Sequence, residues 1–170
     1  ALVREIKPRV VVETGTATGS LTSFILAAIQ RNASGQLISI DLPPQEGKLT
    51  MDLTLATEEI GYYIPEQYRD PWKYIKADAK LELVNVLSNN PVDLFMHDSL
   101  HTRSHMLFEY AVARNLMPEN SIIVSDDIFW NNAFMDFVLT NRLHGYASFS
   151  NPNIGAFVNT FDDLERNAGL

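Results

Sequence analysis

The sequence predicts a three-layer α/β domain in which a mostly parallel, seven-stranded sheet is covered by helices on both faces. Short β-branched and apolar runs alternate along the chain with amphipathic stretches, the pattern of a parallel sheet wrapped by helices. The chain has 170 residues, a usual length for a single domain with a sizeable core, so we expect one domain over 1–170. Its last two apolar runs are separated by Asn151, Pro152 and Asn153, which favours an antiparallel C-terminal hairpin.

The first elements follow from apolar spacing. The run at 9–13 is β-branched and apolar on both faces, as expected of a central parallel strand. A helix beginning near Ser20 is predicted next, because apolar residues recur there with helical spacing at Leu21, Phe24, Ile25, Ala28 and Ile29. Gly35 is expected to end this helical region. A second strand is predicted over 37–40, and Asp41 follows it directly.

Segment 42–73 interrupts this rhythm with prolines, glycines and aromatic residues, and it contains one predicted short helix over 52–59. So long an insertion in a domain is usually functional or mobile, and a lid over the ligand is one hypothesis. An ordinary surface excursion whose aromatic residues pack on the core is the alternative. The remaining predicted strands cover 73–76, 92–97, 121–125, 145–150 and 154–160, and the remaining helices cover 79–87, 102–117 and 133–143.

Composition excludes several classes of protein. Hydrophobic residues make up 46% and charged residues 20%, close to the averages of soluble globular proteins. The net charge is -8 and the Lys and Arg residues are scattered, which disfavours binding to long nucleic acid. The absence of cysteine excludes disulfides, thiolate zinc sites and cysteine nucleophiles. No apolar run is long enough to cross a membrane, and we expect a cytoplasmic protein.

A glycine turn lies between the first predicted strand and the helix that follows it, with the sequence Glu13-Thr14-Gly15-Thr16-Ala17-Thr18-Gly19. Glycines at 15 and 19 permit a tight turn and a close approach of backbone to ligand. The helix N-terminus near Ser20 offers free N–H groups to a carboxylate or phosphate. A purely structural turn is the alternative, since many α/β proteins have one.

The spacing of this turn matches the motif E/D-x-G-x-x-x-G, and the sequence thereby resembles the class I S-adenosylmethionine-dependent methyltransferases, which have a Rossmann-like fold. The resemblance implies that Asp41 binds the ribose hydroxyls and that Asp78 lies near the adenine, although each acid could instead cap a turn or a helix. The cofactor-binding residues that the resemblance implies are Glu13, Gly15, Thr16, Gly19, Ser20, Asp41, Asp78 and Asp98.

Two acidic clusters follow the fourth and fifth predicted strands, at His97-Asp98-Ser99-Leu100-His101 and Ser125-Asp126-Asp127. Ligands of doubly wound sheets bind at the carboxyl ends of strands, so the three carboxylates are expected to converge. Converging carboxylates repel one another unless they are protonated or neutralised, and a divalent cation neutralises them with oxygen ligands. Capping of the following helix by Asp126 and Asp127 is the alternative.

This arrangement resembles the metal-dependent small-molecule O-methyltransferases, including the group with D-x-x-H after strand four and D-D after strand five. The resemblance implies Mg²⁺ or another divalent cation on Asp98, Asp126 and Asp127. It makes Asp98 and His101 catalytic, with His101 as the base that deprotonates the hydroxyl of a small-molecule acceptor. Where many members of this family carry Pro-Gly-Gly before strand five, this chain reads Met117-Pro118-Glu119-Asn120.

Other residues near these clusters have alternative interpretations. Trp130, Asn131 and Asn132 could line the acceptor pocket, although loop capping explains the asparagines equally well. His105 is expected to be an exposed helix residue, and His97 to be structural. The alternatives to a methyltransferase are a nicotinamide-dependent oxidoreductase, which would require G-x-G-x-x-G, and a non-catalytic domain of the same fold. The sequence leaves the identity of the acceptor and a homo-oligomeric state open.

Overall fold

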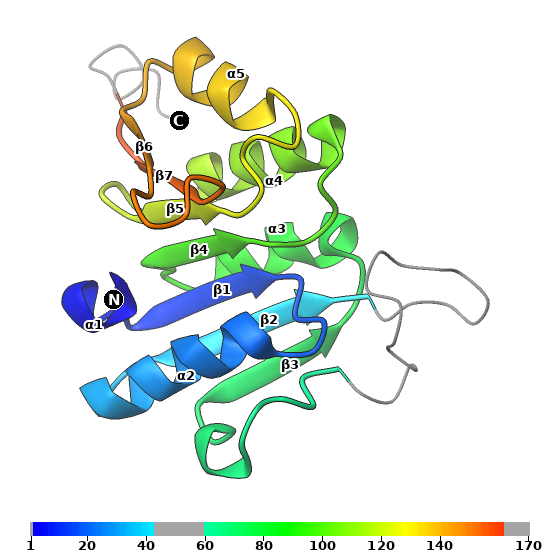
Figure 1. Cartoon of the computed structure of the whole chain (residues 1–170), viewed down its shortest axis with the longest axis vertical. Helices are drawn as coiled ribbons and strands as arrows, with labels where there is room; N and C mark the ends of the chain where they lie inside the picture. The colour runs from blue at the N-terminus through cyan, green and yellow to red at the C-terminus, as the bar shows by residue number, and fades with distance from the viewer. Residues whose placement is uncertain (1, 43–59, 162–170) are drawn as a thin grey trace.

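Figure 1 shows a computed structural model of the chain, which describes residues 2–42 and 60–161. Its strands form one seven-stranded sheet with the order β3-β2-β1-β4-β5-β7-β6. The first five strands pair in parallel, whereas β7 pairs antiparallel with both β5 and β6. The strands are β1 (Val10–Thr14), β2 (Gln36–Asp41), β3 (Trp72–Lys76), β4 (Leu94–His97), β5 (Ile122–Ser125), β6 (Gly145–Ala147) and β7 (Gly155–Val158).

Helices cover both faces of this sheet, with α1 and α2 on one face and α3, α4 and α5 on the other (Figure 1). They are α1 (Leu2–Ile6), α2 (Ser20–Asn32), α3 (Ala79–Asn89), α4 (Arg103–Leu116) and α5 (Ala133–Thr140), with a 3₁₀ helix η1 (Glu66–Tyr68) before β3. The predicted three-layer, mostly parallel sheet with an antiparallel C-terminal hairpin is confirmed. No helix in the described ranges is long and apolar enough to cross a membrane.

Strand β1 shows why the sheet needs helices on both faces. Its five residues are all buried. Because successive side chains of a strand point to opposite faces, Val11 packs into the core beneath α2, whereas Val10 and Val12 pack into the core beneath α3, α4 and α5. The sequence prediction of a central strand, apolar on both faces, is therefore confirmed.

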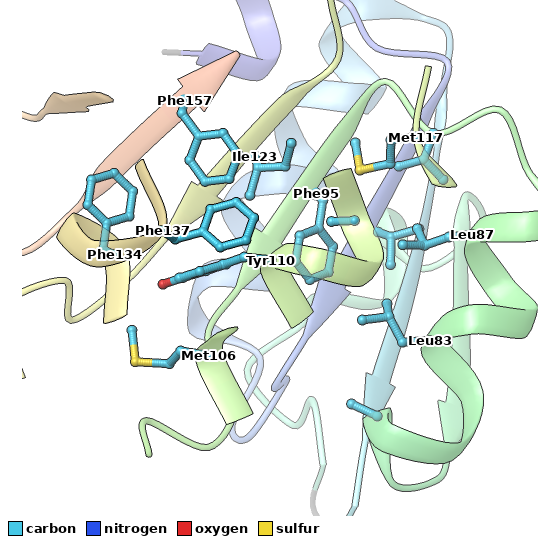
Figure 2. Close-up of a cluster of buried hydrophobic side chains, with 14 of the residues drawn as sticks. Leu83, Leu87, Phe95, Met106, Tyr110, Met117, Ile123, Phe134, Phe137 and Phe157 are labelled. Carbon is cyan, nitrogen blue, oxygen red and sulfur yellow. The ribbon is translucent and has the colours of Figure 1, made fainter. Parts of the chain in front are cut away.

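The larger core lies under α3, α4 and α5, and Figure 2 shows its aromatic centre. The Tyr110 ring meets Phe157 edge to face, with centroids 6.1 Å apart, and Phe137 lies 5.5 Å from both rings. Each large side chain buried in this way contributes about 1.5–3 kcal/mol relative to an exposed one. This core anchors α4 and α5 behind the carboxyl ends of β4 and β5.

Backbone hydrogen bonds continue the sheet past the ends of its strands. The N–H of Gly15 donates to Ile40 O (3.0 Å), that of Asp98 to Thr14 O (2.9 Å), and that of Asp126 to the carbonyl of His97 (2.9 Å). The carboxyl ends of β1, β2, β4 and β5 are thereby aligned. The strand order reverses between β1 and β4, and ligands of open α/β sheets bind at such a switch point.

Some local predictions are corrected by the structure. Phe24, assigned by its spacing to the buried face of α2, is 75% exposed, whereas Leu26 is fully buried, because the inward stripe is centred on Ile25 and Ile29. Helix α2 ends at a left-handed Ala33, whose N–H donates to Gln30 O, so Gly35 lies in the following connection instead of ending the helix. The short helix α1 was not predicted. The predicted helix over 52–59 lies outside the described residues.

Candidate active site

The glycine turn connects β1 to α2 and lies against the segment that follows β4. Gly15 and Gly19 have φ angles of 85° and 84°, in the left-handed region that favours glycine. A Cβ atom on Gly15 would lie 2.0 Å from the carbonyl oxygen of Asp98. Glycine is therefore required at position 15 by the close contact of the two segments as well as by its backbone conformation.

Glu13 lies beneath this turn and is completely buried. Its Oε2 accepts hydrogen bonds from the hydroxyls of Thr22 (2.8 Å) and Ser39 (2.7 Å). Burial raises the pKa of Glu13 to about 7, although the two hydrogen bonds act in the opposite direction. Its Oε1 and the buried hydroxyl of Thr16 have no hydrogen-bond partner among the described residues.

Asp41 brings a second carboxylate to the turn from the end of β2. Its Oδ2 accepts the backbone N–H groups of Thr16 (2.9 Å) and Ala17 (2.7 Å). Glu13, Gly15, Thr16 and Asp41 are thus brought together at the ends of two neighbouring strands. The expected contact of Asp41 with a ribose stays a prediction, and the observed contact stabilises the turn.

Asp78 and Ser20 occupy the starts of two helices. Asp78 is the N-cap of α3, where its side chain accepts the N–H of Lys80 (2.8 Å). The capping alternative is therefore observed for Asp78, and its place near an adenine stays a prediction. Ser20 is exposed at the first turn of α2, whose N-cap, Gly19, provides no side-chain hydrogen bond.

The described end of segment 42–73 is attached to the same turn. The N–H of Gly61 donates to Ala17 O, and that of Tyr63 to Thr18 O, both at 2.9 Å. Arg69 holds this stretch by donating from Nη2 to the carbonyl of Gly61 (2.9 Å). This end of the segment lies beside the turn, as the lid hypothesis requires. Residues 43–59, on which the hypothesis mainly depends, lie outside the described ranges.

Asp98 and His101 are brought together after β4. His101 Nε2 and Asp98 Oδ1 are 3.9 Å apart, and both side chains are partly exposed, by 18% and 30% respectively. Burial, and then the electrostatic influence of His97, lower the pKa of His101 below its usual 6.5. A neutral imidazole able to accept a proton is therefore favoured at neutral pH.

The loop after β5 contacts the segment that carries His101. The side chain of Asn131 donates from Nδ2 to the carbonyl of His101 (3.1 Å), and the rings of Trp130 and His101 have centroids 6.4 Å apart. Asn131 also accepts the N–H of Ala133 (2.8 Å), at the start of α5. The predicted capping role of the asparagines is thus observed for Asn131.

The expected metal site on Asp98, Asp126 and Asp127 is not supported. Within residues 2–42 and 60–161, no group of three or more His, Asp or Glu side chains is arranged to hold a metal ion. The N–H of Asp126 continues the sheet, whereas Asp127 has a φ of 48° and turns the chain away into the loop. Asp98 lies instead beside His101. The carboxylates after β4 and β5 therefore surround one region without forming one set of ligands.

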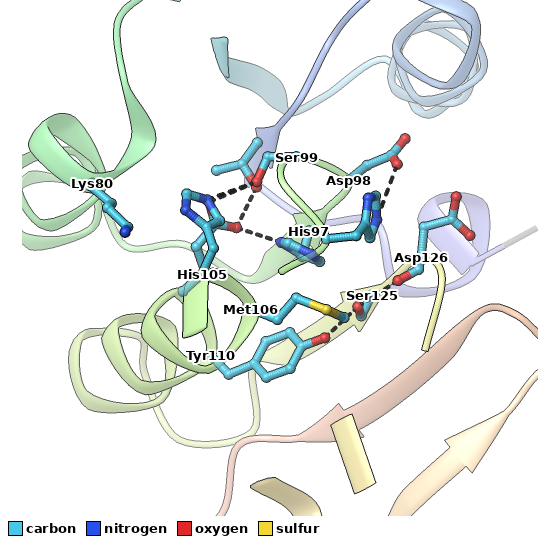
Figure 3. A network of polar contacts seen from close by, with 12 residues as sticks. Lys80, His97, Asp98, Ser99, His105, Met106, Tyr110, Ser125 and Asp126 are labelled. Carbon is cyan, nitrogen blue, oxygen red and sulfur yellow. Dashed lines mark hydrogen bonds and ion pairs between the residues drawn. The ribbon is translucent and has the colours of Figure 1, made fainter. Parts of the chain in front are cut away.

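A buried polar network lies behind Asp98 and is not predicted from the sequence (Figure 3). Glu109 of α4 is fully buried and has four polar partners, the side chains of Thr14, His97, Ser99 and His105. His105, predicted to be exposed, is only 5% exposed, because it contacts Glu109 one helical turn away. The expectation that His97 is structural is confirmed by its complete burial. The available signal was the place of Glu109 on the inward face of α4, beside Tyr110.

Glu109 stays ionised in this network. Burial alone would raise its pKa, but hydrogen bonds from His105 and His97, together with the electrostatic influence of His97, outweigh that effect. The result is a pKa of about 2. A permanent negative charge is therefore held under the loop that carries Asp98 and His101.

A pocket of about 320 Å³ lies between α5, β6 and the loop after β5. Its walls are largely apolar, with two asparagines among them. Asn131 lines this pocket and also contacts His101, so the loop links the two places. The lining residues include Ile128, Phe129, Asn131, Asn132, Phe134, Met135, Tyr146 and Ala147.

Comparison with known proteins identifies one family. A family model described as a methyltransferase domain matches residues 12–128, more than half of the chain. None of the curated proteins compared with the sequence matches it.

Several solved structures share the fold. An SAH-bound methyltransferase of Podospora anserina, PaMTH1, has a TM-score of 0.70 and 14% identity, over 94% of this chain and 75% of its own. An O-methyltransferase of Bacillus cereus in complex with SAH has a TM-score of 0.63 and 16% identity, over 92% and 77%. The O-methyltransferase TomG of Streptomyces achromogenes, in complex with SAM, has a TM-score of 0.64 and 14% identity, over 94% and 77%. These similarities confirm the predicted Rossmann-like fold.

Proposed function

We propose, from the premise that this chain belongs to the family of methyltransferase domains, that it transfers the methyl group of S-adenosylmethionine to a hydroxyl group of a small molecule. The observation that carries the proposal is the contact between the glycine turn and Asp98. This contact lies at the switch point of the sheet, where α/β folds bind ligands, and it brings the expected cofactor turn beside the expected base.

The residues at this turn fit S-adenosylmethionine. Buried polar atoms of Glu13 and Thr16 lack partners in the described part of the chain, and the first N–H groups of α2 have no side-chain cap. Such a helix start suits the carboxylate of the methionine part, and the carboxylates around the turn suit the positive sulfonium. We assign this end to Gly15, Thr16, Gly19 and Ser20, the ribose to Asp41 and the adenine to the neighbourhood of Asp78.

His101 is the proposed base for the transfer. When bound, the cofactor supplies a methyl group on a positively charged sulfur. His101 would take the proton of the acceptor hydroxyl, so that the oxygen could accept the methyl group that the bound cofactor would supply, with the electron pair of the sulfur–methyl bond left on sulfur. Asp98, 3.9 Å from His101, stabilises the imidazolium that results. No step is assigned to a metal ion, because the carboxylates of the site do not form a ligand set within residues 2–42 and 60–161.

The apolar pocket beside this site supports an acceptor with an apolar body. Its wall residue Asn131 bonds to the backbone of His101, so an acceptor in the pocket would lie next to the base. Aromatic and aliphatic walls favour ring-bearing hydroxyl compounds over highly polar ones such as sugars. Two structural neighbours are O-methyltransferases, which agrees with oxygen as the acceptor atom.

Two measurements test the proposal. Calorimetric titration should show binding of S-adenosylhomocysteine and none of NAD, which separates a methyltransferase from an oxidoreductase domain. Transfer of a labelled methyl group to a panel of phenols and alcohols should then occur, and the same panel run with EDTA should give the same rate. Absence of S-adenosylhomocysteine binding would refute the cofactor assignment. Binding without transfer to any hydroxyl compound would refute the acceptor class, and a loss of rate in EDTA would restore a metal to the mechanism.

A further inference from the structure

The buried carboxylate of Glu109 joins parts of the candidate site that lie far apart in sequence. Its Oε2 accepts a hydrogen bond from the hydroxyl of Thr14 (2.7 Å), at the end of β1, and lies 2.6 Å from His97 Nδ1. Its Oε1 accepts a hydrogen bond from the hydroxyl of Ser99 (2.9 Å) and lies 2.8 Å from His105 Nε2. One side chain therefore contacts β1, β4, the segment after β4 and its own helix.

Asp98 is held by this arrangement on both sides, since its two neighbours in sequence are both bonded to Glu109. The N–H of Asp98 donates to the carbonyl of Thr14, a third residue bonded to Glu109. Three residues bonded to Glu109, namely Thr14, His97 and Ser99, therefore hold the contact between Asp98 and Gly15 in place. This is the contact that carries the proposed function.

Stability alone does not account for a carboxylate at this position. Removing an ionised carboxylate from water costs several kcal/mol, and an apolar residue of similar volume often serves stability as well or better. The inward neighbours of Glu109 on α4, Met106 and Tyr110, belong to the hydrophobic core. In contrast to these core residues, all four partners of Glu109 lie at the end of the sheet where the site is formed. The free-energy cost of burying the Glu109 carboxylate is therefore best explained by the geometry that it imposes on the site.

We propose that Glu109 is a positioning residue for methyl transfer, which holds Asp98 and the loop carrying His101 in a fixed place against the glycine turn. This inference rests on the proposed function. Glu109 does not touch the reacting atoms, and it acts through Thr14, His97 and Ser99. Because displacing a catalytic group by about 1 Å can cost on the order of 100-fold in rate, a looser Asp98 segment should lower kcat more than cofactor affinity.

The first test replaces Glu109 with Gln, which keeps the volume and removes one acceptor. We expect kcat to fall about 10-fold to 100-fold, with a change of less than about fivefold in the Kd of S-adenosylhomocysteine. The matched control is Tyr110→Phe, the next residue along α4, which is also fully buried and loses a single hydrogen bond to Ser125 (2.6 Å). The Tyr110→Phe variant should have a lower melting temperature than wild type and the same kcat. Equal kcat in Glu109→Gln and wild type, measured well below both melting temperatures, would overturn the proposal.

A second variant covers the case in which Glu109→Gln does not fold. Ser99→Ala removes one of the three anchors and leaves the carboxylate in place, so kcat should fall several-fold while the Kd of S-adenosylhomocysteine is kept. In the double variant the two losses in kcat should not add, because both changes release the same segment. An unchanged kcat in Ser99→Ala, or fully additive losses, would contradict the positioning role.

Hydrogen exchange gives a readout that does not depend on turnover. Amides of residues 98–102 should exchange faster in Glu109→Gln and Ser99→Ala than in wild type, whereas those of β5 should keep their protection. Tyr110→Phe should leave residues 98–102 unchanged. If wild type transfers no methyl group, the proposed function fails and the exchange data still decide whether Glu109 fixes this segment. If exchange of residues 98–102 is the same in all four proteins, Glu109 does not position it.

Discussion

Glu13 has an acidic side chain at a position from which water is excluded, so its ionisation is coupled to folding. Its folded pKa of about 7 lies above its usual 4.5, and the folded protein therefore binds more protons than the unfolded chain between these values. The contribution of Glu13 to the free energy of unfolding should fall as the pH rises from 4.5 to 7 and stay level above that range. The shift corresponds to roughly 3 kcal/mol.

Glu13→Gln tests this coupling because an amide has the shape of the acid and does not ionise. Measured by urea unfolding, the stability of the variant relative to wild type should rise by roughly 3 kcal/mol between pH 4.5 and pH 8. The same pH dependence in both proteins would mean that folding does not raise the pKa of Glu13.

His101 carries a second prediction at this scale, since a base must be unprotonated to act. Its lowered pKa predicts that kcat/KM falls on the acid side with a midpoint below 6.5. His101→Gln should lose this limb and at least about 100-fold in rate. His144→Gln is the control, because His144 is exposed and takes no part in the site. An acid limb that persists in His101→Gln would assign the proton transfer to another group.

The glycine turn is the element on which the cofactor assignment depends. Gly15→Ala would place a methyl group against the carbonyl oxygen of Asp98, at a φ of 85° that L-residues rarely adopt. We expect lower stability and at least a 10-fold weaker affinity for S-adenosylhomocysteine, measured by calorimetry.

Gly35→Ala provides the matched control for this variant. Gly35 has a φ of 101°, and its added Cβ would meet the carbonyl of Pro8 at 2.5 Å, at the opposite end of the strands. This variant should be destabilised in the same way and keep its affinity for S-adenosylhomocysteine. Equal losses of affinity in both variants would show that the turn has no special place in cofactor binding.

Elements with a strong apolar pattern could be predicted from the sequence, and side-chain directions could not. The valine run of β1 and the Asn-Pro-Asn turn before β7 determine local structure, and both predictions are confirmed. Five-residue α1 is too short to show a helical period. His105 is buried because it contacts Glu109, one helical turn away. The direction of the Glu109 side chain is in turn set by its contacts with β1 and β4. Adjacent acids after β5 resemble a ligand pair in sequence, and the left-handed φ of Asp127 could not be predicted from it.

At the scale of the whole molecule, the site lies where two halves of the sheet meet. Strands β1 and β2 supply the turn, Glu13 and Asp41, and the segment after β4 supplies Asp98 and His101. The apolar pocket continues this second half toward the antiparallel edge, between α5 and β6. Cofactor and acceptor are therefore assigned to opposite sides of the switch point, which predicts that their affinities can be changed separately.

Ala147→Trp tests this separation by filling the pocket from β6. Ala147 is an exposed residue of the pocket wall, so a large side chain can enter the pocket without disturbing the core. The KM for an apolar hydroxyl acceptor should rise at least about 10-fold, because the ring of the acceptor loses its buried surface. The Kd of S-adenosylhomocysteine should stay the same, since the turn lies on the far side of β4.

Leu139→Trp is the control for this change, because Leu139 is 68% exposed on α5 and is not part of the pocket wall. Both kinetic and binding constants should match wild type in that variant. If Ala147→Trp also leaves the acceptor KM unchanged, the acceptor binds elsewhere, and the position of the pocket beside the loop of Asn131 has no catalytic meaning. If it instead weakens S-adenosylhomocysteine, cofactor and pocket are coupled, and the division of the sheet into a donor half and an acceptor half is wrong.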